Sequence, residues 1–166
     1  MLLQVQKTMT TFTHIDDQGR IRMVDISSKP NTMREAVAQC KVVMEPETYR
    51  LICDQKVKKG NVLETARLAG IMAAKKTSEL IPLCHHLPIT HVQIDFFSEE
   101  DGKTIRIEAT VRVTGKTGVE MEALVAASLA ALTIYDMCKS YDRAMNISDL
   151  SLIRKSGGKS GTFIKK

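Results

Sequence analysis

The longest apolar run of the chain, ALVAASLAALTIY (Ala123–Tyr135), restricts the possible folds more than any other segment. Its 13 residues are fewer than the ~20 that span a bilayer, so we expect no membrane association. Gly118 precedes the run, and we predict a helix over about residues 119–139. Because the middle of this helix is apolar nearly all round, other elements must cover it on several sides. The run therefore predicts the core helix of a globular protein.

Alternation of apolar and polar residues predicts four strands, at residues 34–44, 92–96, 105–113 and 147–153. The middle two flank the turn sequence EEDGK and form a hairpin. Pro46 opens a short helix that runs through Ile52. Asn61 caps a second helix, over residues 62–80, with Glu64 in the capping-box position. This order of elements predicts a ferredoxin-like βαββαβ sandwich of the α+β class, with an antiparallel sheet packed on helices.

The composition suits one globular domain over residues 1–166, with residues 1–12 as a loose N-terminal arm and 156–166 as a Gly/Lys-rich tail. A short extended piece is expected at MVDIS, Met23–Ser27. Four cysteines without a CxxC pair, and an N-terminus unlike a signal peptide, predict a cytoplasmic protein. The net charge of +5 suggests an anionic partner (nucleic acid, acidic protein or phosphorylated metabolite), although an ordinary basic protein carries the same charge.

The two ends of the predicted core helix carry charged residues of different kinds. Glu120 and Glu122 at its start are favourable to the helix dipole and have a structural explanation. Asp136 near its end opposes the dipole, and Lys139 is its natural partner, either in a surface salt bridge or in a functional pair. Glu122 and Asp136 lie within about 40° on the helical wheel but roughly 21 Å apart along the axis. One small substrate cannot react beside both ends, so we expect an oligomer if both ends act in one site.

Two glycine-rich segments imitate phosphate-binding loops: TGKTG (Thr114–Gly118) and SGGKSG (Ser156–Gly161). Neither is a Walker A motif, because Thr110 and Ile153 stand where its first glycine would be. Each segment can still offer backbone N–H groups and a lysine to an anion. Flexible turns remain the alternative explanation for both.

The segment LCHHLP (Leu83–Pro88) places a thiol beside two imidazoles. The metal ligands available are Cys84, His85, His86 and His91, but no paired spacing elsewhere completes a tetrahedral site. Adjacent residues of an extended chain point to opposite faces, so at most alternate ones share a site. Three interpretations stay open: a metal site, one imidazole that faces a ligand, and a half-buried structural histidine.

Three segments carry a more specific signal: KKGNVLETARLAGIMAAKKTSELIPLCH, TGKTGVEMEALVAASLAALTIYDMCK and KSGGKSG. Together they resemble the molybdenum cofactor biosynthesis protein C (MoaC) family, the cyclic pyranopterin monophosphate synthases, from about Thr13 to Gly161. The resemblance implies a lyase that converts (8S)-3′,8-cyclo-7,8-dihydroguanosine 5′-triphosphate to cyclic pyranopterin monophosphate and releases diphosphate, without a redox cofactor. It also implies the ferredoxin-like fold and a homohexamer, a trimer of dimers, with active sites between subunits.

Matched motif by motif, the resemblance implies three catalytic residues: Asp136 and Lys139 of YDMCK, and Lys59 of KKG. It further implies a substrate pocket, without a metal, formed by Leu83, Cys84, His85, Glu120, Met121, Glu122, Arg34, Lys75 and Lys155. Asp136 and Lys139 can shuttle protons if their surroundings bring both pKa values towards neutrality. Lys59 can act as an acid or stabilise charge, and Arg34 and the lysines would stabilise charge at the α-phosphorus.

In this interpretation LCHHLP forms one wall of a nucleotide pocket. Cys84 and His85 face or flank the substrate, and we do not expect Cys84 to be a covalent nucleophile. His86 stands where many family members have proline, and we expect it to point elsewhere.

Two other kinds of protein compete with the enzyme. Basic ferredoxin-like sheets include RNA binders, but these stack bases on aromatic side chains of the sheet face, whereas Phe96 and Phe97 are adjacent here. We therefore expect a small nucleotide-derived substrate and no nucleic acid. A catalytically silent subunit is the other alternative, and the presence of Lys59, His85 and Asp136 argues against it.

Overall fold

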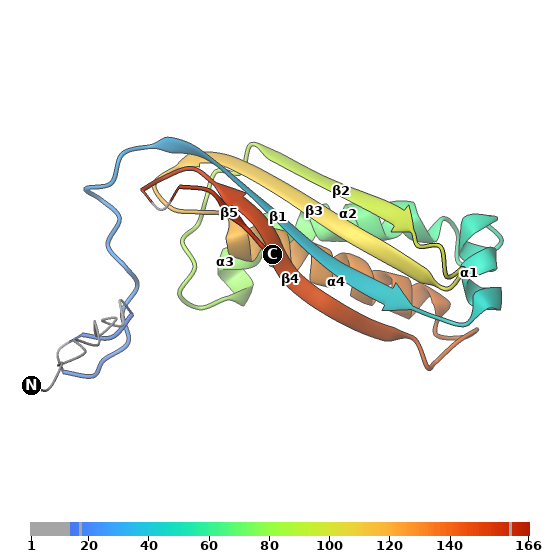
Figure 1. Cartoon of the computed structure of the whole chain (residues 1–166). Helices are drawn as coiled ribbons and strands as arrows, with labels where there is room; N and C mark the ends of the chain where they lie inside the picture. The colour runs from blue at the N-terminus through green and yellow to red at the C-terminus, as the bar shows by residue number, and fades with distance from the viewer. Residues whose placement is uncertain (1–13, 17, 160) are drawn as a thin grey trace, which may run out of the picture.

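The computed structural model describes residues 14–16, 18–159 and 161–166, so the predicted arm at residues 1–12 lies outside the described residues. The elements are β1 (Thr32–Val43), α1 (Pro46–Cys53), α2 (Val62–Lys75), α3 (Thr77–Leu80), β2 (His91–Ser98), β3 (Thr104–Gly115), α4 (Glu120–Cys138), β4 (Asn146–Ser156) and β5 (Phe163–Ile164). The strands form one antiparallel sheet in the order β2-β3-β1-β4-β5, and α2 and α4 cover one face of it (Figure 1). This is the predicted ferredoxin-like βαββαβ arrangement with β5 added at an edge, so the predicted fold class is confirmed.

The two faces of the sheet differ as the alternating sequence predicts. Towards the helices, apolar residues of β1 and β3 pair in register: Ala36 with Val111, Ala38 with Ala109, Cys40 with Ile107, and Val42 with Ile105. The opposite face carries charged side chains, including Glu35, which forms ion pairs with Arg112 and Arg154. The core therefore lies between one sheet face and the two long helices.

The core helix predicted from the longest apolar run is α4, which packs against α2, β1, β3 and β4. Fully buried alanines, such as Ala123 and Ala130, let α4 lie close to its neighbours. Gly70 of α2 has the same effect, because a Cβ there would lie 2.8 Å from the carbonyl oxygen of Ala126. By length and composition α4 resembles a membrane span, but more than half of its apolar stretch is buried in this core, and it is a core helix.

The single helix predicted over residues 62–80 is two helices, α2 and α3. Asn61 caps α2 as predicted, since its Oδ1 accepts a hydrogen bond from the backbone N–H of Glu64 at 3.2 Å. The helix breaks at Lys76, where φ is −109° and ψ is 9°. The hydroxyl of Thr77 donates to carbonyl oxygens in the last turn of α2 and holds this break in place.

The C-terminal end is more regular than the predicted tail. β4 extends to Ser156, and β5, which lies inside the predicted tail, pairs with Arg154 and Lys155. Residues 23–27, predicted as a short extended piece, belong to no strand of the sheet. Two of them, Val24 and Ile26, border a cavity at the N-terminal end of α4.

Candidate active site

Two adjoining cavities open at the N-terminal end of α4. The first, of about 390 Å³, we call the LCH cavity; its lining includes Val24, Leu83, Cys84, His85, Met121 and Glu122. The second, of about 490 Å³, we call the glycine-loop cavity; its lining includes Lys29, Arg34, Lys116, Gly118, Gly158 and Lys159. Four residues border both cavities, so one ligand can occupy the two together: Lys29, Thr117, Gly118 and Glu120.

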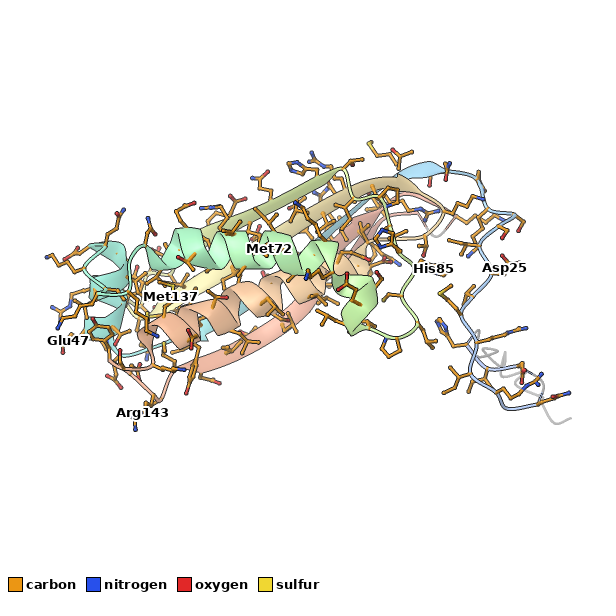
Figure 2. All side chains as sticks on the ribbon, turned by 180° about the vertical axis from the view of Figure 1, so that it is seen from behind. Asp25, Glu47, Met72, His85, Met137 and Arg143 are labelled. Carbon is orange, nitrogen blue, oxygen red and sulfur yellow. The ribbon has the colours of Figure 1, made fainter. Side chains whose placement is uncertain are left out.

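The LCH segment lies in the loop between α3 and β2, where Figure 2 shows His85. Nε2 of His85 lies 2.9 Å from the carbonyl oxygen of Val24, and because that oxygen can only accept, Nε2 carries the proton. His86 does not line the cavity, and its Nδ1 lies 3.3 Å from Ser78 Oγ, so the prediction that it points elsewhere is confirmed. Within the described ranges, His, Cys, Asp and Glu side chains form no group of three that could hold a metal ion.

Glu122 is the buried carboxyl group of the LCH cavity. Its residue is only 4% exposed, and this burial, with a smaller contribution from the charge of Glu120, raises the pKa of Glu122 to about 7. Burial, and then the charge of Glu122, raises the pKa of the Cys84 thiol, which therefore stays protonated. Glu122 can thus give or take a proton near neutral pH, whereas Cys84 fits the prediction that it is not a nucleophile.

The two segments that imitate phosphate loops meet at the glycine-loop cavity, although 37 residues lie between them in the sequence. Arg34 donates from Nε to the carbonyl oxygen of Gly115 at 3.0 Å and from Nη2 to that of Lys116 at 3.2 Å. Gly158 approaches Arg34 from the other side: a Cβ there would lie 2.2 Å from Nη1, and its φ of +74° also favours glycine. Arg34 therefore holds the first glycine segment by two hydrogen bonds and lies against the second, beside one basic cavity.

Most of the predicted pocket residues gather here, with two exceptions. Leu83, Cys84, His85, Glu120, Met121 and Glu122 line the LCH cavity, and Arg34 lines the glycine-loop cavity. Lys155 lines neither, but its Nζ binds Glu120 Oε1 at 2.8 Å and so fixes a carboxylate that borders both. Lys75 is exposed in the last turn of α2 and borders neither cavity, so one chain does not bring it to the site.

The three predicted catalytic residues lie at the opposite end of α4. Nζ of Lys139 is 2.7 Å from Asp136 Oδ1, which confirms the predicted ion pair. Nζ of Lys59 is 3.8 Å from Asp136 Oδ2 and donates to the backbone oxygen of Asp136 at 2.7 Å. A third cavity, of about 390 Å³, is lined by Lys59, Tyr135, Lys139, Ser140 and Arg143; we call it the lysine cavity.

The charges at the lysine cavity move both pKa values away from neutrality. The hydrogen bond and charge of Lys139, with the charge of Lys59, lower the pKa of Asp136, and Asp136 raises the pKa of Lys139. Water also reaches Asp136, whose side chain is 63% exposed. A proton shuttle by Asp136 and Lys139 requires pKa values near neutrality, and one chain does not meet this condition. The pKa of Glu122, at about 7, is by contrast near neutrality.

The two ends of the site stay separate in one chain. Glu122 and Asp136 are both on α4, roughly 21 Å apart along its axis. In the part of the chain that the structure describes, the lysine cavity shares no lining residue with the other two cavities. Several residues that line these cavities were not predicted as pocket residues: Lys29, Lys116, Lys159, Tyr135 and Arg143. The lysines of the glycine segments had been noted as anion ligands, but nothing in the sequence places the turn that carries Arg143.

Comparison with known proteins gives the family. The model of the MoaC family matches residues 23–158. The cyclic pyranopterin monophosphate synthase of Desulfatibacillum aliphaticivorans is 61% identical over 158 residues, covering 95% of this chain and 99% of the relative. The synthase of Desulforapulum autotrophicum is 59% identical over 156 residues, covering 94% and 96%. That of Roseiflexus sp. is 57% identical over 156 residues, covering 94% and 99%. The chain belongs to the MoaC family.

Proposed function

We propose that the chain is a cyclic pyranopterin monophosphate synthase, a lyase of molybdenum cofactor biosynthesis, which is the activity in the names of its relatives. Its proposed substrate is (8S)-3′,8-cyclo-7,8-dihydroguanosine 5′-triphosphate, and diphosphate is the second product. One observation carries the proposal: a partly apolar cavity with a buried carboxyl group adjoins a strongly basic cavity. The first suits the heterocycle, and the second suits the phosphates of the same molecule.

The glycine-loop cavity supports the phosphate part of this proposal. Lys29, Arg34, Lys116 and Lys159 give it four positive charges, and Glu120, the one carboxylate among the described residues that line it, is paired with Lys155. When a ribose hydroxyl attacks the α-phosphorus, the bond to the bridging oxygen breaks and diphosphate leaves with that oxygen. Cations held beside the phosphates stabilise the charge that accumulates during this step.

The LCH cavity supports the proton chemistry. Opening the five-membered ring and building the new ring requires several proton transfers, and a group with a pKa near the working pH transfers protons best. Glu122, with its pKa of about 7, is such a group, and the protonated Nε2 of His85 is fixed on the wall of the same cavity. Asp136, Lys139 and Lys59 would complete the site from a second chain.

We propose that two chains pack their α4 helices antiparallel, as the dimer unit of a cytoplasmic homohexamer. Such packing would bring Asp136 of one chain to the Glu122 end of the other, because the two residues lie on nearly one face of α4. The outer surface of the helices suits a partner, since Leu68 (59%), Met72 (52%) and Leu132 (52%) are exposed there, and Figure 2 shows Met72 on that surface of α2. All four cysteines are free thiols, which fits a reducing compartment.

The direct test is turnover. The purified chain is incubated with the cyclised GTP precursor, and cyclic pyranopterin monophosphate is detected by mass and fluorescence. We expect product from the native chain and almost none from Asp136→Asn. A well-folded oligomer that makes no product would refute the proposed function.

The shared site has its own test. Glu122→Gln and Asp136→Asn are each expected to abolish turnover, and the two variants are then dissociated, mixed in equal amounts and reassembled. Random pairing makes half of the dimers mixed, and one of the two sites in each mixed dimer is intact, so activity should return to about a quarter of the native value. If both residues act within one chain, mixing restores nothing.

A further inference from the structure

The lysine cavity holds more positive charge than its carboxylate can balance. Lys59 and Lys139 share Asp136, and Arg143, on the same cavity, pairs with no carboxylate of the described residues. Lys59, Lys139 and Arg143 therefore lie around one exposed carboxylate, that of Asp136, and their charges attract a further anion to this cavity. A site of this kind is suited to an anionic ligand.

We infer that Arg143 binds an oxygen of the substrate's phosphate chain, and that Tyr135 positions it. The inference rests on the proposed function, because the phosphates are the only anionic groups of the proposed substrate. A guanidinium group can offer two parallel N–H donors to one phosphoryl group, which the two lysines cannot. In the proposed dimer, Arg143 approaches the phosphates from the subunit opposite the glycine-loop cavity.

The backbone around Arg143 is held in place on several sides. Asp142 next to it is buried, and its carboxylate accepts hydrogen bonds from the N–H groups of Glu45 and Ala144, both at 2.8 Å. Tyr135 donates its hydroxyl proton to the carbonyl oxygen of Arg143 at 3.3 Å. An exposed arginine on so fixed a turn loses little backbone entropy when it binds a ligand, which is what a preformed binding residue requires.

The same turn is also tied to the loop that carries Lys59. The hydroxyl of Tyr141 accepts a hydrogen bond from the N–H of Lys58 at 3.2 Å. Lys59 in turn donates to the last turn of α4, which carries Tyr135 and leads to Lys139. The segments that carry the three cations are thus joined by hydrogen bonds, which hold Lys59, Lys139 and Arg143 in a fixed arrangement.

A purely structural role for these cations predicts a different result. A positive charge near the C-terminus of a helix interacts favourably with the helix dipole, so Arg143 could serve only to stabilise α4. In that case, Arg143→Ala would lower the unfolding midpoint and leave substrate binding unchanged. Binding of phosphate predicts the opposite, with an unchanged midpoint and weaker binding.

The test compares KM and kcat of Arg143→Ala with those of Arg50→Ala. Arg50 is exposed on α1 and does not line the lysine cavity. Figure 2 shows Glu47, also on α1, at the same end of the molecule as Arg143. Losing a charge-assisted hydrogen bond should raise KM about tenfold to a hundredfold in Arg143→Ala, with partial rescue in Arg143→Lys. Arg50→Ala should keep the native KM. An unchanged KM in Arg143→Ala would overturn the inference.

Tyr135→Phe tests the positioning role. It removes the hydroxyl bond to the Arg143 carbonyl and should raise KM less than Arg143→Ala does, roughly threefold. In the Arg143→Ala background the same change should have no further effect, whereas an additive effect would mean that Tyr135 does not act through Arg143.

Calorimetric titration with inorganic diphosphate gives a binding readout that does not require the proposed reaction. Diphosphate should bind Arg143→Ala about tenfold more weakly than the native chain, and equal binding would count against the inference. A native chain that binds diphosphate but makes no product would refute the proposed function alone.

Discussion

Replacing Glu122 with glutamine should change how stability depends on pH. Burial raises the pKa of Glu122 from its ordinary 4.5 to about 7, so the folded chain binds this proton more tightly than the unfolded chain. Below pH 4.5 both states are protonated, and the carboxyl group costs no stability. Between pH 4.5 and 7 the unfolded state ionises first, and the native chain loses about 1.4 kcal/mol per pH unit. Above pH 7 the penalty stays constant at roughly 3 kcal/mol.

Glutamine is neutral throughout, so Glu122→Gln should escape this penalty. Urea unfolding at one fixed protein concentration, at about pH 4.5, 6 and 8, measures the free energy of unfolding of each chain. The variant should gain about 3 kcal/mol relative to the native chain between the lowest and highest pH. Glu47→Gln is the matched control, because Glu47 is also in the first turn of a helix but is exposed. A difference that stays constant across the pH range would refute the argument that burial raises the pKa of Glu122.

Three further predictions concern the glycine loop, the helix surface and the thiol. Gly158→Ala would place a Cβ 2.2 Å from Arg34 Nη1, at a φ of +74° that alanine rarely adopts. Steady-state kinetics should therefore show a several-fold higher KM, and an unchanged KM would show that this loop does not set the position of Arg34. Leu132→Glu puts a charge on the exposed apolar surface of α4 and should give smaller particles by light scattering, together with loss of turnover. Cys84→Ala should keep kcat within about threefold of the native value, because burial keeps the thiol protonated, and complete loss of activity would contradict this.

The parts of the fold that the sequence predicts are those that depend on local patterns. Alternation along β1 and the hairpin reflects which face of the sheet is buried, and Asn61 signals the start of α2 through its own hydrogen bond. The break at Lys76 was missed, because no glycine or proline marks it and it depends on how the Thr77 hydroxyl bonds back to α2. β5 was missed since two residues acquire strand structure only by pairing with Arg154 and Lys155.

The candidate site divides in the same way. Helical spacing alone predicted that Glu122 and Asp136 lie at opposite ends of α4. Spacing could not predict that their pKa values move in opposite directions, because that depends on burial and on partners from other segments. Glu122 is 4% exposed, whereas the Asp136 side chain is 63% exposed and has two lysines beside it.

This contrast bears on why a second chain would be needed. Asp136 cannot accept and return protons efficiently while water and Lys139 keep its pKa low. In the proposed dimer the partner's helix covers this end of α4, and removing water favours the neutral forms, which raises the pKa of Asp136 and lowers that of Lys139. Assembly would then supply the condition that one chain lacks. Activity per chain should therefore fall on dilution in step with dissociation, and full activity in the dissociated chain would exclude this coupling.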